Sequence, residues 1–452
     1  MTSRSSSSAS GLPDQPKLRQ SLLFILVALA GFALAPFATA LPGAGSAPIV
    51  VRKPAPEKWQ LVKAFPKLSF QDPLMLIPVP RSNKLCVIGR EGTVEFFVNS
   101  STVAKKALVL DIRNQCQGWN DCGLLGIAFH PDFGKPNSPN RGYFYVWFNH
   151  SDNPTSGPGL PNPSTTTRDR LVRYTIPDGK SAADPASAQI LIDENDYNLW
   201  HNGGGMFFGS DGFLYLSLGD EGSGNDAFHN AQHVDANLFS GVIRIDVNQN
   251  PALSHPIPRQ PANGVTANYM IPNDNPWVGQ PNTLEEFYAI GLRNPHRVTF
   301  DATTNTIFCG DVGQDKIESV DLIVKGGNYR WSYMEGNITG PLGKPAKILG
   351  MEKAPIYTYS HLTGNTCVIG GYVYRGAVMP KYDGQYIFAD NTSSLIFAMT
   401  GWLTGHPTIT QICSLPGVTD YNGISSFGYD AAGNLYICKM GVTNGAIYRL
   451  IP

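Results

Sequence analysis

The stretch at residues 199–222, LWHNGGGMFFGSDGFLYLSLGDEG, indicates how this chain folds. Three glycines precede a short apolar run, Ser210-Asp211-Gly212 supplies turn residues, and the run FLYLSL follows with the alternation that is typical of a strand. Two such runs joined by a turn form a β-hairpin, and the outer ends of a hairpin are neighbours in space. We therefore expect His201, ahead of the first run, to lie beside Asp220, which follows the second.

Pairs of β-rich runs separated by turn residues occur six times, beginning at residues 82, 140, 211, 304, 383 and 431. No long segment carries the i, i+3, i+4 spacing of an amphipathic helix. One hairpin alone is marginally stable, whereas four-stranded sheets arranged radially bury both of their faces and leave only short edges. The pattern therefore predicts an all-β protein, a six-bladed β-propeller of four-stranded antiparallel blades. A tandem of β-sandwiches is the alternative architecture.

The N-terminal region has the pattern of a targeting segment. A polar stretch with Lys17 and Arg19 leads into the apolar run at residues 21–34, and Ala38-Thr39-Ala40 is a small-x-small cleavage pattern. The run is short for a membrane span. We expect a signal peptide at 1–40, a linker at 41–54, a propeller at 55–452 and a secreted protein without a stable membrane span. An uncleaved signal anchor is the alternative.

Composition narrows the function classes. Charged residues make up 15% of the chain and the formal net charge is −1, so no basic face for nucleic acid is expected. In an oxidising compartment most of the seven cysteines would pair, Cys116 and Cys122 are near enough to close a small loop, and the odd count leaves a free thiol. Four N-x-S/T triplets predict glycosylation, at Asn99, Asn149, Asn337 and Asn391.

Two motifs offer acid–base or anion chemistry. A carboxylate that holds a histidine fixes its tautomer and raises its basicity, which makes His201 with Asp220 a candidate general base. The turn LRNPHR at 292–297 presents Arg293 ahead of a strand, where a rigid guanidinium could stabilise an oxyanion. A structural His–Asp contact and an ordinary capped turn are the plainer interpretations.

Two further motifs are weaker. The turns GDEGSGND at 219–226 and GDVGQD at 310–315 combine acids, amides and glycines, and their oxygens could bind calcium. Neither has the spacing of an EF-hand, so ordinary polar turns are the alternative. Arg375 ends the run GGYVYRG at 370–376, where a surface salt bridge is the simplest role.

Five motifs in order resemble the glucose/sorbosone dehydrogenase family. They are CGLLGIAFHPDF at 122–133, the hairpin motif at 201–220, LRNPHR, residues 309–331 and GGYVYRG. This family contains soluble sugar dehydrogenases that depend on pyrroloquinoline quinone (PQQ) and the related hedgehog-interacting-protein-like proteins. The resemblance runs from about Phe65 to the C-terminus, and the hairpin motif and GGYVYRG look closer to the second branch.

The resemblance implies a six-bladed propeller and a set of residue roles. His201 matches the base that takes the substrate hydroxyl proton, Asp220 the residue that orients it, and Arg293 the residue that polarises the quinone carbonyl. Other positions match cofactor contacts, namely Asn294, His296, Asp121 and Arg375, and calcium-binding backbone carbonyls, namely Gly313 and Gln314. The implied reaction oxidises an aldose sugar at C1 to a lactone, with PQQ and calcium as cofactors and an external electron acceptor.

Some positions depart from the family pattern and keep other functions open. Residues 390–399 offer no basic side chain for the quinone, His296 stands where bacterial members often have Gln, and Asp121 is an acid where some members have a neutral contact. A non-catalytic extracellular binding protein of the hedgehog-interacting type is one alternative. The other is a calcium-dependent lactonase or esterase, in which Asp121, Asp220 and Glu318 would ring the ion.

Overall fold

The computed structural model describes residues 59–155, 167–418 and 423–452. The predicted signal peptide and linker lie outside these residues. Strands dominate the described chain, and its only helical elements are three single 3-10 turns, η1 (His361–Thr363), η2 (Pro380–Tyr382) and η3 (Trp402–Thr404). The prediction of an all-β protein is therefore confirmed. No helix in the described part is long and apolar enough to span a membrane.

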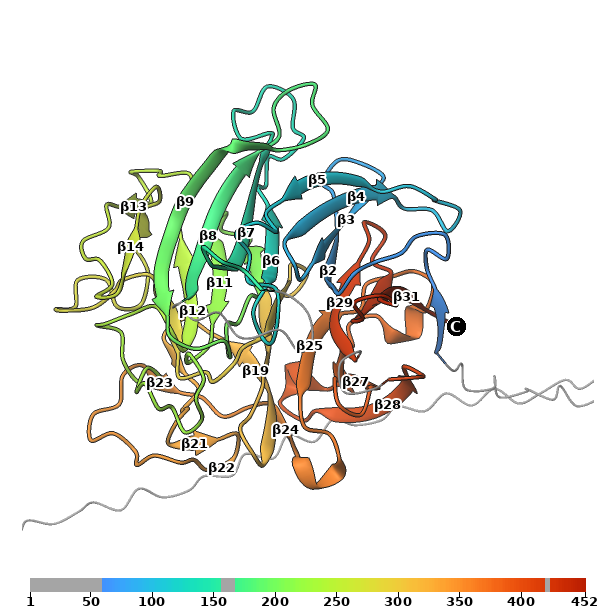
Figure 1. Cartoon of the computed structure of the whole chain (residues 1–452). Helices are drawn as coiled ribbons and strands as arrows, with labels where there is room; N and C mark the ends of the chain where they lie inside the picture. The colour runs from blue at the N-terminus through green and yellow to red at the C-terminus, as the bar shows by residue number, and fades with distance from the viewer. Residues whose placement is uncertain (1–58, 156–166, 419–422) are drawn as a thin grey trace, which may run out of the picture. The chain divides into compact units, whose positions relative to one another are not determined.

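The strands form five larger sheets and two small ribbons (Figure 1). The first sheet has the strand order β1 (Gln60–Lys63), β31 (Ala446–Ile451), β30 (Leu435–Lys439), β29 (Ile424–Tyr429), β2 (Pro73–Pro78), β3 (Lys84–Gly89), β4 (Thr93–Val98), β5 (Ala107–Asp111). The second has the order β14 (Gly264–Thr266), β9 (Asp184–Asp196), β8 (Thr167–Thr175), β7 (Tyr143–His150), β6 (Leu124–Phe129). The third has the order β10 (Met206–Phe208), β11 (Leu214–Leu218), β12 (Gly241–Ile245), β16 (Phe287–Ile290), β20 (Gly327–Asn328), β23 (Met351–Glu352).

Two four-stranded sheets complete the set. They are β17 (Arg297–Asp301), β18 (Thr306–Asp311), β19 (Ile317–Ile323), β24 (Tyr357–Ser360), and β25 (Val368–Val373), β26 (Tyr386–Asp390), β27 (Leu395–Thr400), β28 (Thr408–Ser414). The ribbons are β13 (Ser254–His255) with β15 (Ile271–Pro272) and β21 (Met334–Glu335) with β22 (Ile338–Thr339). Pairing within the two four-stranded sheets is antiparallel throughout, as hairpins require.

The eight-stranded sheet consists of two antiparallel halves that touch at one parallel pairing. Leu76 of β2 pairs with Gly428 of β29, and this is the only register position between the two strands. The half with β29 is completed by β1, whose residues pair with the C-terminal strand β31 from Gln60 opposite Ile451 to Lys63 opposite Tyr448. One sheet half therefore joins the beginning and the end of the described chain.

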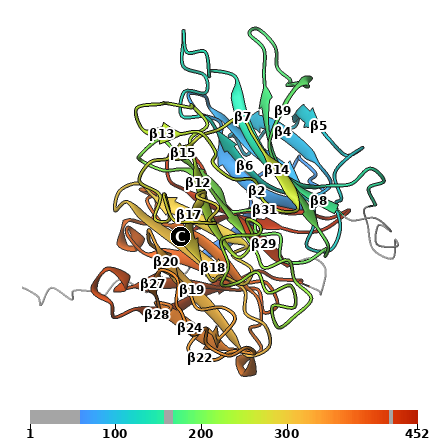
Figure 2. The same cartoon turned by 90° about the vertical axis from the view of Figure 1, so that its left-hand side faces the viewer.

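The inner strands of the sheets contact one another in a closed ring. β2 contacts β6, β6 contacts β10, β10 contacts β17, β17 contacts β25, β25 contacts β29, and β29 contacts β2. Figure 2 shows the same strands after a quarter turn about the vertical axis. Bulky side chains fill the space between the sheets, including the fully buried Trp147, Phe287, Phe308, Phe388 and Phe427. This packing buries apolar area on both faces of the strands.

The disulfide prediction is wrong in this structure. All seven cysteines are free thiols, and five of them are buried. The Cys116 thiol is 3.7 Å from the carbonyl oxygen of Arg90, and the Cys122 thiol is 3.5 Å from that of Leu199, so the two side chains bond to different carbonyls rather than to each other. Burial raises the pKa of both thiols, which keeps them protonated and unreactive.

One of the four predicted glycosylation sites is inaccessible. The Asn149 side chain is fully buried in β7, where it donates to Asp169 and Asn202 and accepts the backbone N–H of Gly123. A glycan cannot be attached to an amide that the folded chain encloses. Asn337, in contrast, is exposed beside β22.

Candidate functional site

His201 and Asp220 lie side by side, as the hairpin pattern predicts. His201 precedes β10 and Asp220 follows β11, and the Nδ1 atom of His201 is 2.6 Å from Oδ1 of Asp220. The Asp220 side chain is 1% exposed and that of His201 is 11% exposed, so a ligand at this end of the ring reaches the imidazole but not the carboxylate. The contact holds Nδ1 as the protonated nitrogen and leaves Nε2 as the available one.

The three glycines before β10 are explained by close backbone approaches. A Cβ on Gly203 would lie 2.4 Å from the carbonyl oxygen of Ser217, and φ of Gly203 is +63°. A Cβ on Gly205 would lie 2.3 Å from the backbone nitrogen of Val298. Side chains at these positions would push β10 away from β11 and β17. The glycines therefore allow the histidine loop to sit close to the neighbouring strands.

Asp220 is fixed by three hydrogen-bond donors. Besides His201, the backbone N–H of Gly222 donates to Oδ1 over 2.9 Å, and Nε1 of Trp331 donates to Oδ2 over 2.7 Å. These donors fix the orientation of the carboxylate beside His201. Sequence reasoning did not identify Trp331 as a site residue, although it ends the motif at 309–331 that the family resemblance includes.

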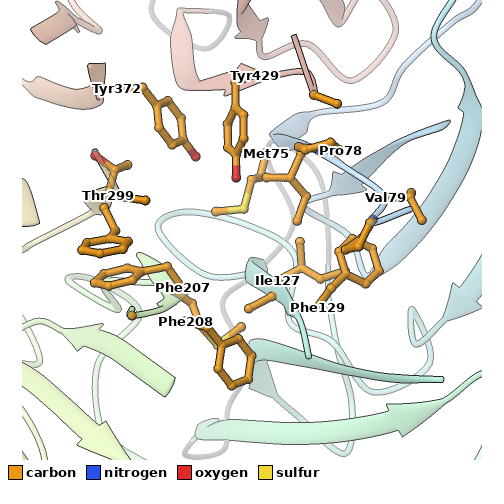
Figure 3. Close-up of a pocket in the computed structure, with 18 of the residues that line it drawn as sticks. Met75, Pro78, Val79, Ile127, Phe129, Phe207, Phe208, Thr299, Tyr372 and Tyr429 are labelled. Carbon is orange, nitrogen blue, oxygen red and sulfur yellow. The ribbon is translucent and has the colours of Figure 1, made fainter. Parts of the chain in front are cut away.

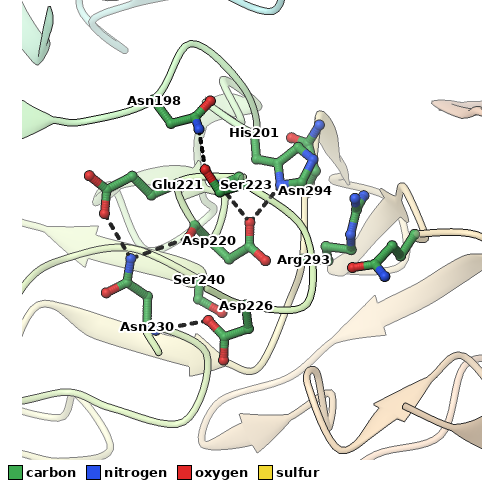
Figure 4. A network of polar contacts seen from close by, with 12 residues as sticks. Asn198, His201, Asp220, Glu221, Ser223, Asp226, Asn230, Ser240, Arg293 and Asn294 are labelled. Atoms are coloured by element: carbon green, nitrogen blue, oxygen red, sulfur yellow. Dashed lines mark hydrogen bonds and ion pairs between the residues drawn. The ribbon is translucent and has the colours of Figure 1, made fainter. Parts of the chain in front are cut away.

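Asp121 connects the histidine loop to the loop that carries the arginine. Its Oδ2 accepts the backbone N–H of His201 over 2.8 Å and the side-chain amide of Asn294 over 3.1 Å. The residue lies just ahead of β6, whereas Asn294 lies ahead of β17. Three loops at the same end of the ring are thus tied to one carboxylate, which sets the distance between His201 and Asn294. Figure 4 shows His201 beside Asp220, with Arg293 and Asn294 nearby.

Arg293 is held from both its backbone and its side chain. Its backbone N–H donates to the Asp311 carboxylate over 3.1 Å, and that of Asn294 donates to the same group over 2.8 Å. Burial raises the pKa of Asp311 to about 7, although these two N–H groups act against the shift. The guanidinium carbon lies 5.6 Å from the centre of the Trp331 ring, which stacks it beside the tryptophan that holds Asp220.

Two buried polar atoms at this site have no hydrogen-bond partner within the described chain. They are Nε of Arg293 and Oδ1 of Asn294. Buried polar groups are nearly always paired, and leaving one unpaired costs about 1–3 kcal/mol. An N–H donor and an amide acceptor on adjacent residues are suited to a ligand that presents both an oxygen acceptor and a donor.

The calcium expectation meets an obstacle in the arginine. Nη1 of Arg293 donates to the carbonyl oxygens of Val312 over 3.0 Å and Gly313 over 2.7 Å. A guanidinium at the Gly313 carbonyl repels a second cation there. The Gln314 side chain donates to Asn225 over 2.7 Å, so the two weak turn motifs pack on each other. The described residues contain no group of three His, Cys, Asp or Glu side chains arranged to hold a metal.

The ring of acids expected for a lactonase is not formed. Asp220 bonds to His201, whereas Glu318 accepts the ring N–H of His361 over 2.7 Å and the backbone N–H of Val368 over 2.9 Å. Asp121 accepts hydrogen bonds from His201 and Asn294. Each carboxylate is thus bound to different protein donors, and the three do not converge on one ion.

Arg375 lies at the other end of the ring, so the structure does not support its predicted cofactor contact. Its Nη2 atom is 2.6 Å from Oδ2 of Asp301, the last residue of β17, and its Nη1 is 3.3 Å from Asp383. Arg293 and Asn294 precede the first residue of the same strand. The salt bridge that sequence reasoning offered as the alternative is what Arg375 makes.

His296 bonds to the inner strand β29. Its Nε2 atom is 3.3 Å from the carbonyl oxygen of Ser425 in β29. Removal from water lowers its pKa to about 4, and the neighbouring Arg297 acts in the same direction, so the imidazole is neutral near pH 7. His296 therefore cannot supply a positive charge to an anionic cofactor at neutral pH.

The family follows from the sequence match. The family model of glucose/sorbosone dehydrogenase matches residues 70–267 and 263–401. The chain belongs to the glucose/sorbosone dehydrogenase family. The match covers β2 to β27 and therefore every site residue described above.

Some relatives of this glucose/sorbosone dehydrogenase family member are named as dehydrogenases, and others are not. The HIPL1 protein of Arabidopsis thaliana is 28% identical over 398 residues, 76% of this chain and 55% of the relative. The human hedgehog-interacting protein is 25% identical over 82% of this chain and 49% of its own length. Quinoprotein glucose dehydrogenase B of Acinetobacter calcoaceticus is 27% identical over 52% of this chain and 45% of its own length. The chain thus spans about half the length of these relatives.

Solved structures show the same fold. The soluble aldose sugar dehydrogenase of Escherichia coli, in its apo-form, superposes with a TM-score of 0.61 at 16% identity, over 87% of this chain and 99% of that one. The PQQ-bound aldose sugar dehydrogenase of Streptomyces coelicolor gives a TM-score of 0.57 at 17% identity, over 88% and 99%. At these identities the likeness establishes the fold alone.

Proposed function

We propose that this protein is a PQQ-dependent dehydrogenase that oxidises an aldose sugar at C1 to its lactone. The observation that carries the proposal is the pair His201–Asp220, which lies at one end of the ring with Arg293 and Asn294 connected to it through Asp121 and Trp331. A base, an orienting carboxylate and a cationic donor around one space are what hydroxyl oxidation requires.

The residues fit a quinone on one side of the site. The unpaired Nε of Arg293 and Oδ1 of Asn294 would hold it. PQQ, when bound, supplies the electrophilic carbonyl that accepts a hydride. Arg375 is not part of this proposed site, and calcium is not assigned to Gly313 and Gln314 while the arginine bonds to the Gly313 carbonyl.

The protein's own part in the reaction is proton transfer and positioning. His201 takes the proton of the sugar C1 hydroxyl at Nε2, because Nδ1 already donates to Asp220. The imidazolium that forms is stabilised by the Asp220 carboxylate. Asp121 keeps the histidine loop and Asn294 at a fixed separation, so that the substrate hydroxyl meets a base in a defined orientation. Loss of this proton together with a hydride from C1 gives the lactone, and an external acceptor then takes up the electrons.

We also propose six blades for the fold and secretion for the chain. The closed ring of contacts among β2, β6, β10, β17, β25 and β29 supports one blade behind each inner strand, with the eight-stranded sheet counted as two blades. Secretion is supported by the signal-peptide pattern at residues 1–40.

A non-catalytic binding protein is the second candidate. The similarity to HIPL1 and to hedgehog-interacting protein favours it, as does the acidic Asp121 at the place where a trianionic quinone would bind. In that case the His201–Asp220 contact would be structural. The partner would be bound regardless of the chemistry of the imidazole.

Reconstitution distinguishes the two candidates. The purified protein is incubated with PQQ, with and without calcium, and dye reduction is followed with a panel of aldoses while retained quinone is measured by absorbance after gel filtration. We expect quinone retention and sugar-dependent turnover, loss of turnover in His201→Ala with quinone retained, and loss of retention in Arg293→Ala. Arg375→Ala is the matched control and should behave like the wild type. If the wild-type protein retains no quinone and reduces no dye, the dehydrogenase proposal is wrong.

A further inference from the structure

A large cavity opens at the other end of the ring from His201. Its volume is about 970 Å³, in the range of small-molecule pockets. Every inner strand contributes the residues near its C-terminal end, including Ile77 (β2), Phe129 (β6), Phe207 and Phe208 (β10), Thr299 and Phe300 (β17), Tyr372 (β25) and Tyr429 (β29). His201, Asp220, Arg293 and Asn294 are absent from its lining, so it is separate from the site proposed above.

The lining is mostly apolar and carries two unpaired phenols. Met75 and Phe207 line the cavity, and the Phe207 ring stacks on that of Phe300, with the ring centres 5.5 Å apart. Figure 3 shows the hydroxyl ends of Tyr372 and Tyr429 pointing into the same space. Their ring centres are 4.9 Å apart, and neither hydroxyl has a hydrogen-bond partner within the described chain. Two adjacent O–H donors in an apolar cavity are suited to an acceptor on a ligand.

The charges around the cavity are of one sign. Arg297 and Arg81 are among the lining residues, and no Asp or Glu is. Arg297 is 2% exposed and donates only to backbone carbonyls, those of Leu74, Leu125 and His296, while its Nε has no partner. Within the described residues neither arginine forms a salt bridge. Burial lowers the pKa of Arg297 to about 10, which still leaves it charged at neutral pH.

A neighbouring cavity also contains a buried arginine, but that arginine has counter-ions. The second cavity, of about 400 Å³, shares Phe207 and Phe300 with the first. Its buried Arg244 is paired with Asp211 at 2.9 Å and Asp274 at 2.7 Å. A buried charge without a partner is costly, and the fold has neutralised it in one cavity but not in the other.

We propose that the larger cavity binds an amphipathic monocarboxylate of the fatty acid type. The apolar body lies against Met75 and Phe207, and the carboxylate accepts from the hydroxyls of Tyr372 and Tyr429 in the field of Arg297. Apolar area drives the binding, and the charged hydrogen bonds select an acid over a neutral molecule of the same length. This binding does not depend on the proposed dehydrogenase activity.

Calorimetric titration of the full chain with decanoate and with decan-1-ol tests the proposal. We expect decanoate to bind at least tenfold more tightly than the alcohol, because only the acid offers a charged acceptor to the two phenols. In Tyr372→Phe/Tyr429→Phe the affinity for decanoate should fall about tenfold or more, and the affinity for decan-1-ol should stay the same. Tyr448→Phe, outside the cavity, is the matched control and should bind both probes as the wild type does.

The comparison of acid with alcohol uses the wild-type protein, so it holds even if the double variant folds poorly, which a thermal melt would reveal. Equal affinities for decanoate and decan-1-ol would mean apolar partitioning alone and would overturn the proposal. Absence of binding by decanoate would overturn it as well, as would unchanged decanoate affinity in a folded double variant.

Discussion

Replacing Asp220 by asparagine tests how the buried carboxylate organises the site. The carboxylate accepts from three donors, the ring N–H of His201, the backbone N–H of Gly222 and the indole N–H of Trp331. Asparagine has one acceptor oxygen and an NH₂ group in place of the second. If its oxygen stays with His201 and Gly222, the NH₂ faces the indole N–H. If it turns toward Trp331, the Gly222 N–H is left without an acceptor.

Either arrangement leaves at least one buried donor unpaired. Such a donor costs about 1–3 kcal/mol, so we expect the free energy of unfolding of Asp220→Asn to fall by that amount. The measurement is urea denaturation followed by tryptophan fluorescence, to which Trp331 contributes as one of seven tryptophans. Asp178→Asn is the matched control, because Asp178 makes an exposed ion pair with Arg141, and exposed pairs contribute little to stability.

The same variant has a distinct catalytic prediction under the proposed function. Asparagine can donate to Nδ1 of His201 and so favour the wrong tautomer, which should lower kcat far more than KM. An Asp220→Asn protein that matches the wild type in stability to within about 0.3 kcal/mol, with unchanged tryptophan emission, would contradict the three-donor description.

Three further outcomes are expected. Gly203→Ala should destabilise the fold by more than Gly212→Ala, because both residues have positive φ but only at Gly203 would the new Cβ meet a backbone atom, at 2.4 Å. Chemical denaturation compares the two variants, and equal losses of stability would contradict the packing argument. Burial raises the pKa of Glu286 to about 7, so its contribution to stability is present below its unfolded pKa and is lost as pH rises to 7. The wild-type free energy of unfolding should therefore decline between pH 4.5 and 7, and in Glu286→Gln this decline should be smaller by up to about 3 kcal/mol. Denaturation measured at a series of pH values compares the two proteins. After secretion from a eukaryotic host, mass spectrometry should find glycan on the exposed Asn337 and none on the buried Asn149.

Local parts of the site could be predicted from the sequence. His201 and Asp220 flank one hairpin, and a hairpin brings its ends together whatever the rest of the chain does. The approach of Asp121 and Asn294 to this pair could not be derived that way, because it depends on three loops from different sheets. Only the family resemblance pointed to these residues. Trp331 was missed because its indole N–H meets Asp220 from more than a hundred positions away in the chain.

Other expectations failed for identifiable physical reasons. Arg375 ends a strand run in the sequence, but the sequence does not say to which end of the ring that strand runs. The structure places it with Asp301. The cysteines were expected to pair because of the assumed compartment, whereas the fold buries five of them as separate thiols. The glycine-rich turns looked like cation ligands, yet Gln314 and Asn225 satisfy each other instead.

The pairing of β1 with β31 determines how the molecule responds to a pulling force. Gln60 stands opposite Ile451, so the chain enters and leaves the sheet at the same end of this antiparallel pair. Tension applied through the two termini would therefore break the hydrogen bonds one after another rather than load them all together. The first mechanical event would be low-force peeling of the edge strand β1, after which β31 would become the edge of the half sheet and would be open to pairing with another chain.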